Sequence, residues 1–590
     1  MMTQATRTVA ALHTTARIAL VVGALLVAAP TYAQVVATRA LKAPVIDGRD
    51  DDAVWQALTP TRGFRQFDPR EDGPPEFQSE YRVAYDDRFF YVLVRAFDPH
   101  PDSIVRLLSR RDVKTNSDQL GIIIDGFHDR RNAAQFWVNP AGVKRDGVFF
   151  NDVTEDMSWD GVWDVGVHID RLGWAAEFRV PFSQLRFAAS DTLEFGLSVV
   201  REISRLNQKD SWPMYRRSVK SVVGQLGTVS GIRGVPAARR LEILPYTVTK
   251  SVPDAAAGRP NVTRFAAGLD VKAGLGSNLT LDATINPDFG QVEADPAILN
   301  LTAFETRFDE RRLFFQEGLG RFRCGGVCDG PFYTRRIGRT PHLRSAAGDK
   351  AFTSILGAAK VTGKFSNGVT LAVLDAVTQE ERGTSGGVIE PQTNYFVMRT
   401  ALESDDGSRQ AGVLVTDTHR RLDAATSPLL RGAATMAMLQ GSARFAHDQF
   451  EIMGFKSQSF VTGSAAALAL TQRNSVHYFQ RPGNEMGFDS TRTSLTGGGI
   501  GGSIKKLRGA VRYETFLRHS SPGQEMNDLG LVPNVNDMSI RQSVDYQPIN
   551  PGRWFRSAFT QFSAESHWTT GGLPTGRSFG IHSSAPPQLL

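Results

Sequence analysis

Short segments in which apolar and polar residues alternate follow one another along the chain from residue 38. In the first third of the chain they read SEYRVAYDD, RFFYVLVRAFD, DQLGIIIDGF and GWAAEFRVP, and Gly, Pro, Asn or Asp residues separate them. Short strands rich in Val, Ile, Phe and Tyr at regular spacing are typical of antiparallel sandwiches. The pattern therefore predicts a β-sandwich over residues 38–205.

A second series of alternating segments occupies residues 206–590. LDVKAGL and LTLDATI predict a hairpin with Val271 and Leu281 on an apolar face and Lys272 and Asp282 on a polar face. SILGAAKVTGKF and VTLAVLDAVTQ follow, joined by SNG, and an Asn-Gly turn favours a tight hairpin. An apolar outside with a polar inside is typical of a transmembrane barrel, although a half-buried soluble sheet shows the same alternation.

Together these patterns predict an all-β chain in which an N-terminal β-sandwich precedes an antiparallel transmembrane β-barrel. No segment after residue 33 approaches the ~20 apolar residues that a spanning helix needs, so a membrane crossing requires a closed barrel. The sequence ends in FGIHSSAPPQLL, with paired prolines and without a recognisable final strand. A truncated barrel, whose closure is in doubt, is therefore expected.

The N-terminal residues have the pattern of an export signal. Arg7 and Arg17 precede the apolar run IALVVGALLVAAP, and small residues follow up to Ala33, which predicts a signal peptide over residues 1–33. A membrane anchor is the alternative, but the apolar run is short for one. In an exported protein the only two cysteines, Cys324 and Cys328, are expected to form a disulfide. Zinc is the competing interpretation, although two ligands are too few.

Charge changes the picture in one segment. The net charge of +6 is spread over 590 residues without a basic block, so nucleic acid is not an expected partner. Residues 286–318, NPDFGQVEADPAILNLTAFETRFDERRLFFQEG, carry seven carboxylates. We expect a short helix or compact loop, inside a barrel lumen or across its periplasmic mouth. Its carboxylates are expected to pair with Arg335, Arg336 and Arg339 of the following segment. Glycoside hydrolysis by two of these acids is the alternative, but the sequence fixes none of their distances.

The first domain resembles the family 9 carbohydrate-binding-module-like domains. IDGRDDDAVW, YDDRFFYVLVRAFD, SDQLGIIIDGFHD, FWVNPAGVKRDG, WDGVWDV and GWAAEFRVPFSQLRF carry the resemblance in that order. It implies a β-sandwich that binds sugars through aromatic stacking and polar side chains, often with structural calcium. Whether the chain is an enzyme stays open: a binding protein without catalytic activity is the favoured interpretation, and a glycoside hydrolase is the alternative.

Candidate binding residues follow from the chemistry of a sugar ring, which has an apolar face and a polar rim. Trp159 and Trp163 in MSWDGVWDV, and Trp137 in QFWVNP, can cover the apolar face, although a tryptophan in a sandwich strand is more often a core residue. Arg110 and Arg111 can bond the hydroxyl groups, with solvated surface charge as the alternative. Asp118, Asp125 and Asp129 flank one predicted strand and its turn and could hold Ca²⁺, or have ordinary turn and capping roles.

The second region resembles the poorly characterised outer-membrane domain that follows such sandwiches in exported bacterial proteins. Residues 286–318 and FYTRRIGRTP carry this match, within a loop or plug segment over residues 286–345. The resemblance implies a barrel in outer-membrane lipid and supplies no catalytic residues. We expect an oligo- or polysaccharide-binding protein of the cell envelope, with a periplasmic or surface-exposed sandwich. The alternatives are an exported hydrolase of O-glycosyl bonds and a structural or secretion-related barrel.

Overall fold

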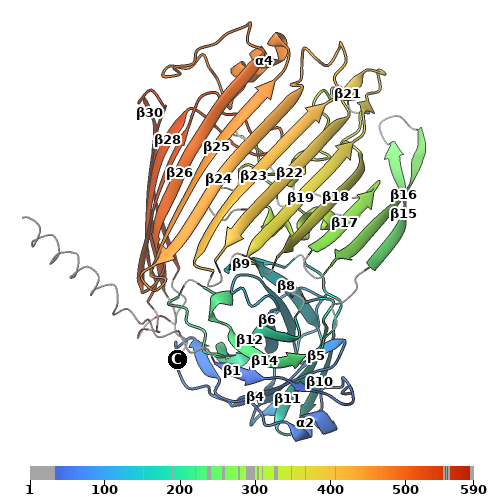
Figure 1. Ribbon diagram of the computed structural model, residues 1–590, viewed down its shortest axis with the longest axis vertical. Helices are drawn as coiled ribbons and strands as arrows, with labels where there is room; N and C mark the ends of the chain where they lie inside the picture. Colours follow the sequence, from blue (N-terminus) through green and yellow to red (C-terminus); the bar gives the residue numbers. More distant parts are fainter. Residues whose placement is uncertain are drawn as a thin grey trace, which may run out of the picture.

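The computed structural model describes residues 33–584, apart from short gaps. The gaps are residues 151, 158, 186, 188–189, 220, 236–240, 255–258, 277–278, 288–298, 302–304, 309, 324–329, 347, 366, 405–406, 549, 551, 553–554 and 556–557. The described chain is all-β, with a sandwich below a large curved sheet of tilted strands in Figure 1.

The sandwich consists of two sheets. The larger sheet contains β1 (Gln34–Val36), β14 (Gly227–Arg233), β12 (Thr192–Ile203), β6 (Gln119–Asp125), β7 (Ala133–Val138), β8 (Lys144–Phe150) and β9 (Thr154–Asp156), with β13 (Gln208–Trp212) and β3 (Arg65–Asp68) beside β12. The smaller sheet contains β10 (Asp164–Asp170), β11 (Gly173–Pro181), β5 (Phe89–Phe97), β4 (Ser79–Tyr85) and β2 (Thr38–Arg39). Three 3₁₀ turns lie between these strands, η1 (Pro101–Ser103), η2 (Ser204–Leu206) and η3 (Val223–Gln225).

Burial on both faces explains why apolar and polar residues do not simply alternate along the central strands of the sandwich. Phe90, Phe136 and Phe195 meet between the two sheets in one buried cluster. Residues on the other face of β5 and β11 are covered by the short helix α2 (Ala53–Ala57), which inserts Trp55. Because both faces of β5 are buried, seven consecutive residues inside this strand are buried.

The sandwich is longer than the predicted 38–205. β13 pairs with β12, and β14 pairs with both β12 and β1, so these later strands belong to the larger sheet. The chain passes to the curved sheet between Arg233 and Leu241. The sequence interpretation placed the boundary too early because β14 has the same alternating composition as the strands that follow it.

The curved sheet is a continuous antiparallel meander. Its fourteen strands are β15 (Leu241–Asp254), β16 (Arg259–Leu275), β17 (Leu279–Ile285), β18 (Ile355–Lys364), β19 (Val369–Thr378), β22 (Thr393–Glu403), β23 (Arg409–Arg420), β24 (Ala433–Phe445), β25 (Phe450–Thr462), β26 (Ser494–Lys506), β27 (Val511–Ser520), β28 (Asp537–Tyr546), β29 (Phe559–Trp568) and β30 (Pro574–Ser584). A separate two-stranded hairpin, β20 (Glu381–Arg382) and β21 (Val388–Glu390), lies in the β19–β22 connection.

The predicted hairpin registers are confirmed. Val271 pairs with Ala283 and Lys272 with Asp282, so the predicted apolar and polar faces coincide across β16 and β17. Along β17 the polar residues are buried on the inner face, and the apolar residues are more exposed. Buried and more exposed positions also alternate along β19 and β22, but their buried positions include apolar residues such as Leu374 and Val397.

The connection between β17 and β18, here called the lumen segment (residues 286–354), lies against the inner face of the curved sheet. Phe315, Phe322 and Ile337 of this segment pack against inward residues such as Leu374 and Val397. Its described regular structure is limited to α3 (Leu313–Gln316), η4 (Leu319–Arg321) and η5 (Thr334–Arg336). The described residues of the predicted loop or plug segment thus lie against the inner face, while its position inside a closed lumen stays a prediction.

The curved sheet is open in the described chain, because no pairing joins its first strand β15 to its last strand β30. The expectation that no strand forms near the end of the sequence was wrong, since Pro574–Ser584 pairs along β29. The longest helix here is α4 (Ala465–Arg473), in the β25–β26 connection. Within the described residues, we find no helix with the length and apolar character to cross a membrane.

Candidate functional site

A cavity lies between the sandwich and the lumen segment. It encloses about 730 Å³, part of it open to solvent. The sandwich side comes from the β6–β7 turn, β7, β8, β9 and two loops, and the lumen segment closes the opposite side. The lining residues are Ile124, Gly126, Phe127, Asn132, Ala133, Ala134, Val148, Phe149, Asp156, Trp159, Gln184, Leu185, Glu317, Gly318, Gly320 and Arg321.

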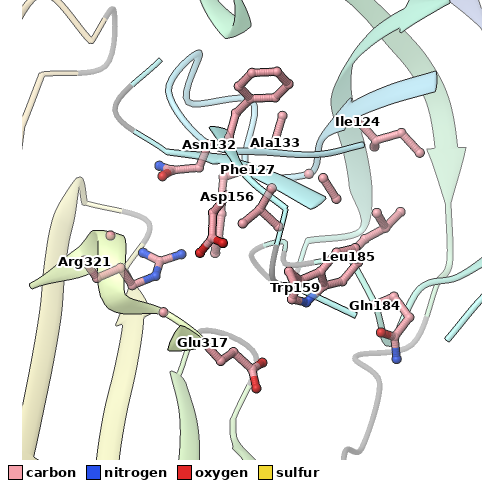
Figure 2. A pocket seen from close by; sticks show the side chains of 16 residues that line it. Ile124, Phe127, Asn132, Ala133, Asp156, Trp159, Gln184, Leu185, Glu317 and Arg321 are labelled. Atoms are coloured by element: carbon pink, nitrogen blue, oxygen red, sulfur yellow. The ribbon is translucent and has the colours of Figure 1, made fainter. Parts of the chain in front are cut away.

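Trp159 is the one tryptophan among the residues that line this cavity. Its ring packs edge-on against Phe136 of the core, with 5.8 Å between the ring centroids. The backbone of Gly161 lies close beneath the indole, because a Cβ at this position would come within 2.5 Å of the ring. The ring is therefore held in place from the sandwich side while it lines the cavity (Figure 2).

Polar groups surround the aromatic surface. Asn132, Asp156 and Gln184 come from the sandwich, and Figure 2 shows Trp159 and Arg321 on opposite sides of the space, with Asp156 between them. Carboxylates accept hydrogen bonds, guanidinium groups donate them, and amides do both. The cavity thus presents an apolar surface next to mixed donors and acceptors.

The lumen-segment side is fixed by the curved sheet. Lys272 of β16 is paired with the Glu317 carboxylate. Lys360 of β18 donates to the Glu317 carbonyl oxygen at 2.7 Å, and Arg399 of β22 donates to the Arg321 carbonyl oxygen at 3.0 Å. Three cations on inward-facing strand positions therefore hold the turn that closes the cavity.

The other two predicted tryptophans lie elsewhere. Trp163 is only 2% exposed, contacts Phe136 edge-on and stacks on Phe178 at 5.9 Å, so its ring is part of the core. Trp137 is 8% exposed and lines a second cavity on the larger sheet. The Arg145 guanidinium covers its ring at 4.8 Å.

The two predicted arginines do not line the cavity. Arg110 is exposed to solvent. Arg111 forms an ion pair with buried Asp146 at 2.7 Å and donates to the Gly161 carbonyl oxygen at 2.8 Å. Because Gly161 lies beneath the indole of Trp159, Arg111 positions the loop that carries this tryptophan.

The three predicted calcium ligands do not form one set: Asp125 and Asp129 are neighbours, but Asp118 lies apart from them. Asp118 precedes β6 and Asp125 ends it, and at ~3.3 Å per residue this strand separates them by roughly 20 Å. The ammonium group of Lys364 lies 3.0 Å from Asp129. The described residues contain no group of three or more His, Cys, Asp or Glu side chains that could hold a metal ion. Calcium binding therefore stays a prediction, and these three aspartates do not supply a set of ligands for it.

Hydrogen-bond donors or charged groups of the protein itself lie next to each of these aspartates. Burial, the largest cause, raises the pKa of Asp118, which accepts the Ser204 N–H at 2.9 Å. Burial and neighbouring Asp129 raise the pKa of Asp125 well above its ordinary value. Burial acts in the same direction on Asp129, but Lys364 and hydrogen bonds from Asn132 outweigh it and lower its pKa.

Three carboxylates of the lumen segment form ion pairs with nearby cations. Glu305 binds Arg336 through two hydrogen bonds of 2.8 Å, which confirms the predicted pairing with the following basic segment. Glu310 pairs with Arg312 at 2.7 Å, and Glu317 with Lys272. The expected Cys324–Cys328 disulfide lies outside the described residues.

Sequence reasoning missed most of the cavity. Asn132 and Asp156 carry no motif, Gln184 lies within GWAAEFRVPFSQLRF but was not singled out, and Arg321 lies outside the predicted basic segment. Glu317 was noted among the acids of residues 286–318, but nothing placed it beside a tryptophan of the first domain. Glu317 and Trp159 lie far apart in the sequence, so the sequence alone does not show that their two domains meet at this cavity.

One protein family matches part of the chain. It is described as "Domain of unknown function (DUF5916)", and its profile covers residues 237–400, which run from the start of the curved sheet into β22. No curated protein matches the chain. This match covers less than half of the chain and leaves its function open.

Solved structures resemble the two parts separately. A family 9 carbohydrate-binding module from Caldicellulosiruptor kristjanssonii in complex with glucose has 16% identity and a TM-score of 0.24, covering 33% of this chain and 94% of that chain. OpdK from Pseudomonas aeruginosa with vanillate has 10% identity and a TM-score of 0.25, covering 79% of this chain and 86% of that chain. A BenF-like porin from Pseudomonas fluorescens has 9% identity and a TM-score of 0.26, covering 79% and 86%. Likenesses this low carry no argument, and the proposals below depend on the geometry.

Proposed function

We propose that this chain is an outer-membrane protein that binds a neutral saccharide in the cavity between its sandwich and its lumen segment. The observation that carries the proposal is the indole of Trp159 on a cavity wall rimmed by Asn132, Asp156 and Gln184. An indole covers the apolar face of a sugar ring, and fixed amides and carboxylates bond its hydroxyl groups.

The charges of the cavity favour a neutral ligand. Asp156 and Glu317 contribute negative charge to the lining, and Arg321 contributes positive charge. Because Lys272 compensates Glu317, Asp156 and Arg321 leave the lining without a net charge that would attract an anionic sugar. We therefore expect uncharged hexose units rather than uronic acids.

The outer face of the curved sheet supports the membrane location. Large apolar side chains are exposed along successive strands on this face, among them Leu402, Leu439, Phe460, Ile500, Leu517, Val544, Phe562, Phe579 and Ile581. Apolar surface this extensive is typical of membrane or protein contacts. Near one end of the strands, Phe445 stacks on Phe450, which also contacts Tyr513. Aromatic bands at strand ends are typical of the membrane interface.

Binding is tested with the full chain in detergent on an array of neutral and acidic glycans. We expect binding to neutral glycans and a loss of roughly five- to thirtyfold in affinity for Trp159→Ala, since stacking of this kind contributes on the order of 1–2 kcal/mol. Trp568→Ala is the matched control, because Trp568 ends β29 at the far end of the curved sheet.

Two results would overturn the proposal. One is a wild-type chain that binds no glycan of the array. The other is equal binding by the Trp159→Ala and Trp568→Ala chains, because the saccharide would then be bound away from the cavity. Membrane location is checked separately by fractionation, where recovery of the chain with soluble periplasmic proteins would contradict it.

A further inference from the structure

The two ends of the curved sheet differ in the length of their connections. At the end that adjoins the sandwich, hairpins are closed by residues 276–278, 365–368, 404–408, 446–449 and 507–510. At the opposite end five connections are longer, residues 286–354, 379–392, 421–432, 463–493 and 521–536, and two are short, residues 255–258 and 569–573. β15 begins and β30 ends at the short-turn end, because β15 starts opposite the end of β16 and β30 finishes opposite the start of β29.

The sandwich is docked on the short-turn end (Figure 1). Arg131 donates to the carbonyl oxygen of Gly407, in the β22–β23 turn, at 3.0 Å. Gly509, in the β26–β27 turn, donates its N–H to the Ser218 carbonyl oxygen at 3.2 Å. Asp152 of the sandwich forms a 3.2 Å ion pair with the arginine near the end of β24, Arg444.

The one longer connection at this end also contacts the sandwich. It spans residues 547–558, and its Asn550 side-chain oxygen accepts the Glu71 N–H at 2.9 Å. The contacts therefore reach three separate connections and the end of a further strand. The sandwich is therefore held by several parts of the short-turn end of the curved sheet and not by a single loop.

We infer that the sandwich faces the periplasm and that the saccharide cavity opens at the periplasmic mouth of the curved sheet. Outer-membrane strands are joined by short turns on the periplasmic side and by longer loops outside the cell. This inference depends on the proposed outer-membrane location, and it assigns the saccharide partner to the periplasmic side of that membrane. Helix α4 and the long connections 379–392, 421–432, 463–493 and 521–536 then lie at the exterior end, whereas the lumen segment reaches back to the cavity.

Cysteine labelling in whole cells tests this orientation. In a chain with Cys324→Ser and Cys328→Ser, single thiols are introduced by Leu108→Cys in the sandwich and Leu470→Cys in α4. Both positions are exposed, at 85% and 49%. A membrane-impermeant maleimide should label the α4 variant on intact Gram-negative cells. The sandwich variant should react only after the outer membrane is permeabilised, with at least a tenfold gain in signal.

Labelling of the Leu108→Cys chain on intact cells would overturn the orientation, and so would an α4 variant that reacts only after permeabilisation. Both variants are also labelled in lysates, so that each signal is expressed relative to full reaction. Failure of saccharide binding would leave the labelling pattern unchanged, whereas a reversed pattern would leave binding by the purified chain unchanged. The two proposals therefore fail separately.

Discussion

The Lys364 ammonium group of the curved sheet lies 3.0 Å from the Asp129 carboxylate of the sandwich. It also lies 2.7 Å from Glu403 on β22, and all three side chains are largely buried. One cation thus compensates two carboxylates at the contact between the domains. Removal of one member of a buried ion pair costs about 3–5 kcal/mol, because the remaining charge stays buried without compensation.

Replacement of Lys364 by Met should therefore weaken docking of the sandwich. A convenient reporter is the antiparallel bridge between Val219 and Arg508, which joins the two domains. Bridge partners have Cα atoms about 4.5–5.5 Å apart, within the range that a disulfide spans. In a chain without the native cysteines, the Val219→Cys, Arg508→Cys pair should cross-link readily. Lys364→Met should lower that yield several-fold.

Lys114→Met is the control for the loss of a lysine. Lys114 pairs with Glu202 on the sandwich, and its side chain is half exposed, so the pair contributes at most about 1 kcal/mol. Its cross-linking yield should equal that of the parent. A Lys364→Met chain that cross-links as completely as Lys114→Met would show that the buried pair does not hold the domains together.

Replacement of Trp163 should affect stability. Its indole is buried between Phe136 and Phe178, so Trp163→Ala leaves a cavity in the core and should cost about 3–5 kcal/mol. The indole Nε1 has no hydrogen-bond partner among the residues that the structure describes, so Trp163→Phe should keep most of the packing without losing a bond. Urea unfolding of the sandwich in the detergent-solubilised full chain measures both. Equal stability of Trp163→Ala and wild type would place this ring outside the core.

Arg336 should stabilise the lumen segment through both of its contacts. It binds Glu305 with two hydrogen bonds and donates from Nε to the Gly530 carbonyl oxygen at 2.8 Å. Arg336→Lys keeps the charge but cannot reproduce this planar set of donors. We expect a loss on the order of 1–3 kcal/mol, because a buried acceptor is left unsatisfied.

The measurement for Arg336 is the temperature at which the folded form loses its distinct mobility on a semi-native gel. Arg336→Lys should lower this temperature by several degrees. Glu305→Gln is the comparison, because Glu305 is half exposed and its amide keeps an acceptor oxygen. A transition for Arg336→Lys at or above that of Glu305→Gln would argue against the Gly530 contact.

Local patterns in the sequence were sufficient for the strands but not for the site. Alternation determined the faces of β16 and β17, because side chains on a strand have a period of two and a shift by one residue would turn Lys272 to the outer face with the apolar side chains. The Glu305–Arg336 pair could be anticipated because an acidic segment precedes a basic one. The cavity could not, since it requires the position of Trp159 relative to Glu317, and no local pattern encodes that distance.

The sequence alone also did not reveal the roles of individual residues. A tryptophan in a strand-rich segment has the same sequence signature whether it is buried, as Trp163 is, or lines a cavity, as Trp159 does. Asp129 was predicted as a metal ligand because oxygen ligands cluster near it. Its cation is instead a lysine more than two hundred positions away, Lys364. Only the docking of two domains brings these charges together.

The last prediction concerns pH and depends on Glu177, which holds the N-terminal part of the sandwich. Its carboxylate accepts the Trp55 indole N–H at 2.6 Å and the backbone N–H groups of Asp47 and Gly48 at 3.0 Å. Burial, which outweighs these donors, raises the pKa of Glu177 from 4.5 to about 7. Between these two pH values the folded chain binds more protons than the unfolded chain, so the free energy of unfolding falls as pH rises. The fall should be on the order of 3 kcal/mol between pH 4.5 and 7.

Urea unfolding of the sandwich at pH 5 and pH 8 measures this fall in stability, and Glu177→Gln, which cannot titrate, should lack this component. If the wild-type and Glu177→Gln chains lose the same stability over this interval, the carboxyl of Glu177 is already ionised at pH 5 and its three donors outweigh its burial.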